Sequence, residues 1–286
     1  MPDLPLIVWV LIAGVLGLMI GSFLNVVILR LPARLDALWR QEAHDVLGLE
    51  AAPTPLPPGI VRESSHCPHC KQPLAIQDNI PLFSWLWLRG RCRYCKAPIS
   101  IQYPLVELLA AVLSALVVWK FGTTWAALAG LFLTWTLVSI SGIDLRTQLL
   151  PDQITLPLLW AGLLISLSHL FVGTASSILG AAIGYLSLWS VYWLFKLLTG
   201  KEGMGFGDFK LLAALGAWMG PLALLPIILL SSLVGALIGG FLIAMQRHNR
   251  ELPMPFGPFI ALAGWVWFIA GDWLQQCYLA MFGIGR

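Results

Sequence analysis

Residues Ile7 to Leu29 read IVWVLIAGVLGLMIGSFLNVVIL, a run of 23 residues in which Ser22 and Asn25 are the only polar interruptions. As an α-helix this run would be about 35 Å long, which is enough to cross the hydrocarbon core of a bilayer. A cleaved signal peptide carries positive charge before its apolar stretch, whereas here Asp3 precedes the run and Arg30 follows it. The run therefore predicts an uncleaved membrane anchor with its N-terminus outside.

The composition of the whole chain favours a membrane protein. Of its 286 residues, 58% are apolar, 11% are charged and 14 are tryptophan, and the mean hydropathy is +0.83. Soluble globular domains carry about 25% charged residues, so most of this chain's surface is expected to face lipid rather than water. The net charge of +3 is too small to indicate a nucleic-acid partner.

Seven further apolar runs follow the first, and together they predict an all-α polytopic membrane protein of about eight transmembrane helices. Gly220-Pro221 divides the long run from Leu211 to Met245, because proline cannot continue a helix interior, and this makes the sixth span short. Lys and Arg collect in cytoplasmic loops, which places the loops 30–102, 144–153, 199–208 and 247–255 inside. The seven runs are residues 103–120, 124–143, 154–172, 176–198, 209–221, 224–246 and 256–281.

The segment between the first two spans differs in kind from the rest of the chain. It holds nine of the 17 Lys and Arg residues, and residues 51–58 read AAPTPLPP, which is typical of an extended linker. The sequence therefore predicts three parts: a first transmembrane helix at 1–30, a small cytosolic insertion at 31–102, and a seven-helix transmembrane domain at 103–286.

Four cysteines of the insertion form two C-x-x-C pairs that are separated by 21 residues. Paired thiolates at this spacing can close a tetrahedral zinc site, and so short a segment needs such a cross-link to hold a fold. Two disulfides are the alternative, but they do not suit a reducing cytoplasm. His66 and His69 flank the first pair and could substitute as ligands. The pattern predicts structural zinc bound by Cys67, Cys70, Cys92 and Cys95.

Carboxylates at the ends of membrane spans need an explanation because charge is costly in lipid. Asp152 follows a proline and opens a helix, so a helix cap accounts for it. Asp144 lies at the C-terminal end of its helix, where the helix dipole disfavours an anion, and this favours a functional role. Asp208 begins a helix, so capping and catalysis both remain open there. Glu107 and Asp272 lie inside apolar runs, and the role of Asp272 stays unassigned.

Glycines alternate with other residues just before Asp208, in the sequence Gly203-Met-Gly-Phe-Gly207. Such glycines let a foreign backbone approach the carboxylate without a side-chain clash. Asp144 and Asp208 both fall at the cytoplasmic ends of their helices in the predicted topology, so they can meet. Of two adjacent carboxyls, one keeps its proton while the other activates a water, which is the chemistry of aspartic proteases.

Several short motifs occur together along nearly the whole chain. They are Gly21-Ser-Phe-Leu-Asn25 with Arg30-Leu-Pro32, the two C-x-x-C pairs, Tyr103-Pro-Leu-Val-Glu107, Asp144 with Leu150-Pro-Asp152, and Gly205-Phe-Gly207-Asp208. With this combination the chain resembles the type IV prepilin peptidases, which are leader peptidases and N-methyltransferases of pilus and type II secretion systems. The last motif alone also resembles that of presenilin-like intramembrane proteases, so the cysteines make the resemblance specific.

The resemblance implies an aspartyl protease of the bacterial inner membrane with Asp144 and Asp208 as its catalytic pair. Its substrates would be prepilins and pseudopilins with a short basic leader, cut after a glycine at the cytoplasmic face. The enzyme would then methylate the new N-terminal residue with S-adenosylmethionine.

The resemblance also implies roles for residues outside the aspartate pair. Gly90 and Arg91 would take part in methyl transfer, and Glu107, Gly205 and Gly207 would bind the substrate. A membrane transporter whose intramembrane carboxylates carry protons or cations is the alternative from another class.

Overall fold

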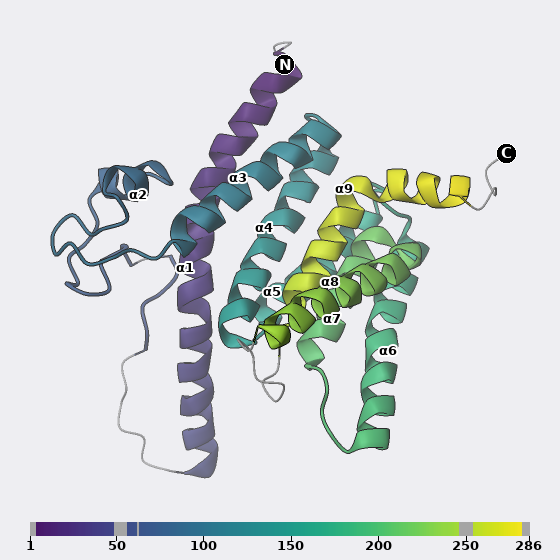
Figure 1. Ribbon diagram of the computed structural model, residues 1–286. Coiled ribbons are helices and arrows are strands. Elements are labelled where there is room, and N and C mark those ends of the chain that lie inside the picture. Colours follow the sequence, from purple (N-terminus) through teal and green to yellow (C-terminus); the bar gives the residue numbers. More distant parts are fainter. Residues whose placement is uncertain (1–3, 49–55, 62, 246–253, 282–286) are drawn as a thin grey trace. The chain divides into compact units, whose positions relative to one another are not determined.

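The computed structural model describes residues 4–48, 56–61, 63–245 and 254–281. Within these ranges the regular structure is helical, apart from two isolated β-bridges in the insertion, which agrees with the predicted fold class (Figure 1). The chain divides into two compact units, Met1–Ser139 and Ile140–Arg286, and each is described by itself.

In the first unit, two helices pack directly against each other. They are α1 (Leu6–Leu47) and α3 (Gln102–Phe121). A Cβ atom added at Gly17 or at Gly21 would lie 2.6 Å from a backbone atom of α3, so glycine is what lets the two backbones approach. The side-chain amide of Asn25 donates to the carbonyl of Tyr103 at 3.1 Å. The sequence motifs that begin at Gly21 and at Tyr103 therefore face each other.

The first helix is longer than the apolar run that predicted it. It has 42 residues and continues through Pro32 to Leu47, past the boundary at residue 30 that was expected from hydropathy. The extension carries charged side chains, so an apolar run could not reveal it. Arg30 donates to the carbonyl of Gly59 at 2.7 Å and ties the insertion to the helix. Most of the expected linker at 51–58 lies outside the described residues.

The insertion is a short folded segment that contains η1 (Ile76–Asn79) and α2 (Phe83–Trp87). The buried carboxylate of Asp78 accepts hydrogen bonds from the guanidinium of Arg93 at both of its oxygens, at 2.8 Å and 3.0 Å. The two isolated bridges pair His66 with Pro73 and Arg91 with Pro98. Each C-x-x-C pair is therefore held in a turn of the same kind.

In the second unit, α7 (Phe206–Met219) is the core helix. Its residues from Leu211 to Trp218 are all buried, as expected for a helix that is apolar on every side. The hydroxyl of Ser177 donates to the carbonyl of Ala217 at 2.6 Å, and the indole of Trp218 donates to the carbonyl of Leu158 at 2.8 Å. The other elements are α4 (Trp125–Thr147, from Ile140 on), α5 (Asp152–Ser166), α6 (Thr174–Thr199), η2 (Pro221–Ala223), α8 (Leu224–Ala244) and α9 (Gly257–Met281).

The prediction of eight membrane spans is not confirmed. Among the described residues, six helices are long and apolar enough to cross a bilayer, and α5 and α7 are not among them. With 15 and 14 residues, each of the two is about 22 Å long, against about 30 Å of hydrocarbon. The apolar runs continued beyond the ends of both helices, through Leu167 to Val172 and through Gly220-Pro221, so hydropathy overstated their lengths.

Candidate active site

Asp144 lies near the C-terminal end of α4 and is held by the first residue of another helix. Asp144 is only 4% exposed, and its Oδ2 atom accepts a hydrogen bond of 3.0 Å from the backbone N–H of Gly257. The first N–H groups of a helix have no partner inside the helix and carry partial positive charge. The unfavourable position of Asp144 on its own helix is therefore offset by the N-terminus of α9, 113 residues away in the sequence.

Asp208 lies in the first turn of α7 and is 7% exposed. Its backbone N–H donates to the carbonyl of Gly205 at 3.3 Å, and its carboxylate is hydrogen-bonded to the backbone of Gly205. A carboxylate at the third residue of a helix that accepts a hydrogen bond from the backbone of the N-cap residue helps to cap the helix. The capping function that the sequence left open is thus present, but it does not exclude a second role.

The two carboxyl groups lie close enough within the second unit for their charges to interact. The charge of Asp144 acts on the carboxyl of Asp208, which is a like-charge interaction between the two acids. Each is also bound at the N-terminus of a helix, Asp208 at α7 and Asp144 at α9. Positive helix ends at both acids offset part of their repulsion and can stabilise one negative charge shared by the pair.

Leu150, in the loop between α4 and α5, fills the space between the two helix ends. A Cβ atom at Gly207 would lie 2.6 Å from the Cβ of Leu150. A Cβ atom at Gly257 would lie 3.0 Å from Cδ2 of Leu150 and 2.7 Å from Oδ2 of Asp144. The open side of Gly207 is therefore occupied by Leu150, whereas a Cβ atom at Gly205 would meet nothing within 4 Å.

Asp152 has a partner that the sequence analysis missed. It begins α5 without any side-chain capping bond, so the expected helix cap is wrong. Its carboxylate instead pairs with the ammonium of Lys210 at 2.6 Å and 2.8 Å. Since Lys210 follows Asp208 by two residues on α7, this ion pair joins the start of α5 to the start of α7. The sequence does show that Lys210 lies just after the start of a helix, which suggests an ion pair. It does not show which acidic residue is the partner.

The four cysteines of the first unit come together. Their sulfur atoms all lie within 4.8 Å of one another, with Cys67 and Cys92 buried and Cys70 and Cys95 exposed. The thiols are free, and the sulfurs of Cys67 and Cys95 are 3.8 Å apart. A tetrahedral ion with bonds of about 2.3 Å to sulfur places its ligands about 3.8 Å from one another. The residues therefore fit a metal ion held by four thiolates.

The two cysteine turns share their backbone geometry. Cys67 and Cys92 each accept from the amide four residues later, and Lys71 and Lys96 at those positions both have φ of 59°. In the first turn, hydrogen bonding from the backbone N–H of Cys70 lowers the pKa of the Cys67 thiol to about 6, while desolvation and the neighbouring thiols raise the pKa of Cys70 to about 11, so Cys67 ionises first. A thiol that ionises readily is suited to bind a metal cation.

The remaining candidate residues of the first unit have evident structural contacts. Gly90 has a φ of 66°, and a Cβ atom there would lie 2.9 Å from the ring of Trp85, so both backbone conformation and packing require glycine. The side chain of Arg91 is exposed. Glu107 is buried on α3 and accepts a hydrogen bond of 2.7 Å from the backbone N–H of Leu82. Asp272, on α9 in the second unit, is exposed and does not lie in a buried site.

Sequence similarity to known proteins extends over nearly the full length of the chain. A protein named prepilin leader peptidase/N-methyltransferase from Xanthomonas campestris pv. campestris is 56% identical over 272 residues, which are 95% of each chain. Proteins of the same name match from Aeromonas hydrophila (55% over 267 residues, 93% of this chain and 92% of the relative) and Pseudomonas aeruginosa (50% over 275 residues, 96% and 95%). The profile of the type IV leader peptidase family matches residues 131–240. This chain belongs to the type IV leader peptidase family.

A second family model matches the N-terminal part of this chain. The bacterial peptidase A24 N-terminal domain matches residues 15–121, which contain the four cysteines. Membership confirms the resemblance that the motifs indicated. No solved structure matches the chain. The relatives bear the name of a peptidase and N-methyltransferase, and none of these findings supports the alternative function of ion transport.

Proposed function

We propose that this protein removes the basic leader peptide from type IV prepilins and type II secretion pseudopilins, and then methylates the new N-terminal amine. The proposal is supported by family membership and by one observation on the residues. Asp144 and Asp208, which are 64 positions apart in the sequence, interact through their charges at the starts of two helices. This is the arrangement that water activation by an acid pair requires.

In the proposed cleavage one carboxyl is ionised and accepts a proton from water as the water attacks the scissile carbonyl. The other carboxyl is protonated and donates its proton toward the carbonyl oxygen. Collapse of the tetrahedral intermediate breaks the C–N bond, and the proton taken from water passes to the leaving amine. The helix N-termini at Gly257 and Gly205 help to keep one negative charge on the pair throughout.

Substrate geometry supports a site at the membrane edge. A prepilin leader is basic and stays in the cytoplasm, while the segment that follows it is an apolar helix in the membrane, so the scissile bond falls at the interface. We infer a multi-pass protein of the inner membrane, with its N-terminus outside and the aspartates and the insertion on the cytoplasmic side. The open side of Gly205 is the proposed place for the substrate backbone.

The metal is proposed to be zinc with a structural role. Four thiolates complete a tetrahedral shell and leave no position for a catalytic water, so the ion would hold the insertion together and not take part in cleavage. S-adenosylmethionine is the proposed methyl donor. It would transfer its methyl group to the amine nitrogen that cleavage exposes, and the nitrogen would lose a proton.

The test is to co-express the protein with a prepilin and to measure the mass of the pilin by mass spectrometry, which reports the cut site and the methyl group together. Asp144→Asn and Asp208→Asn should each give uncut prepilin while the enzyme stays in the membrane fraction. Full processing by either variant would rule out the acid pair.

A further inference from the structure

One face of the insertion is apolar and exposed. Its side chains come from η1, α2 and the turn between them, and the most exposed are Ile76 at 94% and Trp87 at 84%. A cluster of large apolar side chains on the surface of a small segment marks a site of interaction with an apolar partner. The insertion face is defined here as Ile76, Ile80, Phe83, Leu86 and Trp87.

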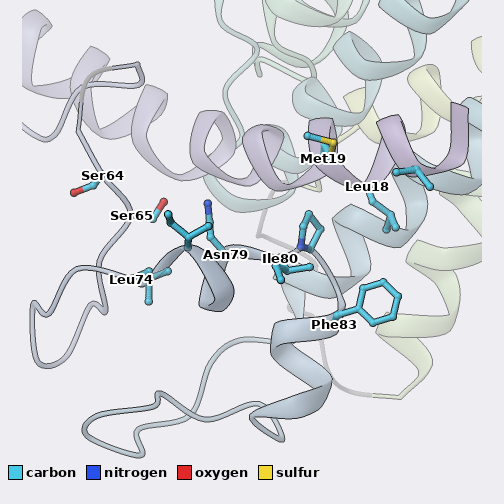
Figure 2. A pocket seen from close by; sticks show the side chains of 11 residues that line it. Leu18, Met19, Ser64, Ser65, Leu74, Asn79, Ile80 and Phe83 are labelled. Atoms are coloured by element: carbon cyan, nitrogen blue, oxygen red, sulfur yellow. The ribbon is translucent and has the colours of Figure 1, made fainter. Parts of the chain in front are cut away.

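A groove of about 620 Å³ lies between the insertion face and α1 (Figure 2). Its lining is mainly apolar and includes the polar residues Ser64, Ser65 and Asn79. Both walls belong to the first unit. Side chains that form the two walls are Val15, Leu18 and Met19 from α1, and Ile76, Ile80 and Phe83 from the insertion face.

The α1 wall of this groove belongs to the membrane-spanning part of the helix. Val15 and Met19 lie in the middle of the apolar run 7–29, and Met19 is 61% exposed. With Leu11 they follow one another at a spacing of four residues, which is one face of a helix. Exposed apolar side chains at that depth face lipid. The insertion face is therefore continuous with a lipid-facing surface.

A hydrogen bond fixes the start of α2 at the same depth. The backbone N–H of Leu82 donates to the carboxylate of Glu107 at 2.7 Å. The Cα of Glu107 packs against Gly21, which lies inside the apolar run of α1, one helical turn before Asn25. In lipid a backbone N–H group without a partner is costly, so a bond from a neighbouring helix is what an immersed helix start requires.

Charge at the end of α2 agrees with a bilayer as the partner. Arg89 and Arg91 follow the helix directly, and both side chains are exposed. Arginine next to an apolar face is suited to anionic phospholipid headgroups, and tryptophan such as Trp87 prefers the membrane interface.

We propose that residues 76–87 rest in the bilayer beside α1, with phospholipid acyl chains in the groove and headgroup phosphates at Arg89 and Arg91. The insertion is then cytosolic only in its cysteine turns. This assignment rests on the membrane-spanning role of α1 and does not depend on the chemistry of the aspartates.

The test places the photo-crosslinking residue p-benzoylphenylalanine at Phe83 or Trp87 of the full-length protein. The protein is reconstituted in nanodiscs of phosphatidylethanolamine and phosphatidylglycerol and irradiated. The mass of the intact protein with any crosslinked lipid is then measured by mass spectrometry. Leu11 is the control that faces lipid, and Tyr94, between the polar Arg93 and Lys96 of the second cysteine turn, is the control expected to face water.

Phospholipid adducts at positions 83 and 87 comparable to those at Leu11, with background levels at Tyr94, are the expected result. Lipid adducts at Leu11 without any at 83 or 87 would overturn the proposal. So would crosslinks from 83 or 87 in cells to a protein, whether a second copy of this chain or a prepilin. Arg89→Gln should lower the share of phosphatidylglycerol among the adducts at Trp87, and Lys71→Gln, on the first cysteine turn, should leave that share unchanged.

Discussion

The backbone N–H of Gly257 donates a hydrogen bond of 3.0 Å to Oδ2 of Asp144, and this contact joins the start of α9 to the end of α4. A carboxylate at the C-terminal end of a helix is normally disfavoured by that helix. Here a second helix supplies the compensating dipole. The position of the Asp144 carboxyl thus depends on how closely α9 can approach it.

We expect Gly257→Ala to reduce cleavage strongly while the protein remains inserted. The added Cβ would lie 2.7 Å from Oδ2 of Asp144 and 3.0 Å from Cδ2 of Leu150, so one of them must move. Displacing a catalytic group by about 1 Å can lower a rate about 100-fold. The measurement is the rate of leader removal from a purified prepilin. Gly240→Ala is the control, since a Cβ atom there meets nothing within 4 Å, and wild-type activity in Gly257→Ala would contradict the assignment.

Gly205→Ala and Gly207→Ala should fail in different ways. A Cβ atom at Gly205 has open space, so stability should be kept while cleavage falls if a substrate backbone passes there. At Gly207 the new atom would overlap Leu150, and overpacking of this kind costs about 1 to 3 kcal/mol of stability.

Thermal unfolding in detergent and cleavage rates, measured on the same preparations, separate the two effects. Leu150→Gly combined with Gly207→Ala should recover part of the stability, because it removes the Leu150 Cβ that would lie 2.6 Å from the added methyl group, together with the rest of that side chain. Unchanged cleavage by Gly205→Ala would argue against a substrate path along that residue.

Asp152→Asn should leave leader removal largely intact. Asp152 is paired with Lys210, but both side chains are partly solvent-exposed, and exposed ion pairs contribute about 0 to 1 kcal/mol. The assay is the one used for Asp144→Asn, run side by side. A loss of activity as complete as that of Asp144→Asn would show that Asp152 belongs to the reacting groups.

The purified protein should contain about one zinc ion per chain, as expected for a four-thiolate site. Elemental analysis should show that Cys67→Ser and Cys92→Ser lose this metal, because removal of one thiolate opens the shell. His69→Ala should keep it, which separates a four-cysteine site from one that uses a histidine. Metal-free wild-type protein, isolated without chelators, would refute the site.

The elements that sequence analysis predicted well are those with a local signal. Length and apolarity located the long helices, and the C-x-x-C spacing predicted a cluster that the structure brings within bonding distance of one ion. The aspartate pair was inferred from topology, and the structure does bring the two acids into electrostatic contact. Their catalytic role stays a proposal.

What could not be predicted depends on contacts between distant residues. No local pattern joins Asp144 to Gly257 or Asp152 to Lys210. The continuation of α1 to Leu47 was missed because the residues after Pro32 include many charged side chains and no longer form an apolar run. The shortness of α5 was missed because apolar residues continue beyond its end at Ser166.

Burial of α7 on all sides has a consequence for how the enzyme responds to its membrane. A helix that touches lipid adjusts its tilt to bilayer thickness, whereas α7 is surrounded by α5, α6 and α9. Thinning or thickening of the membrane acts first on those outer helices, so the carboxyl of Asp208 is insulated from changes in lipid composition. The carboxyl of Asp144 is bound by the start of the outer helix α9, so a change in membrane thickness should act on the acid pair through Asp144 and not through Asp208.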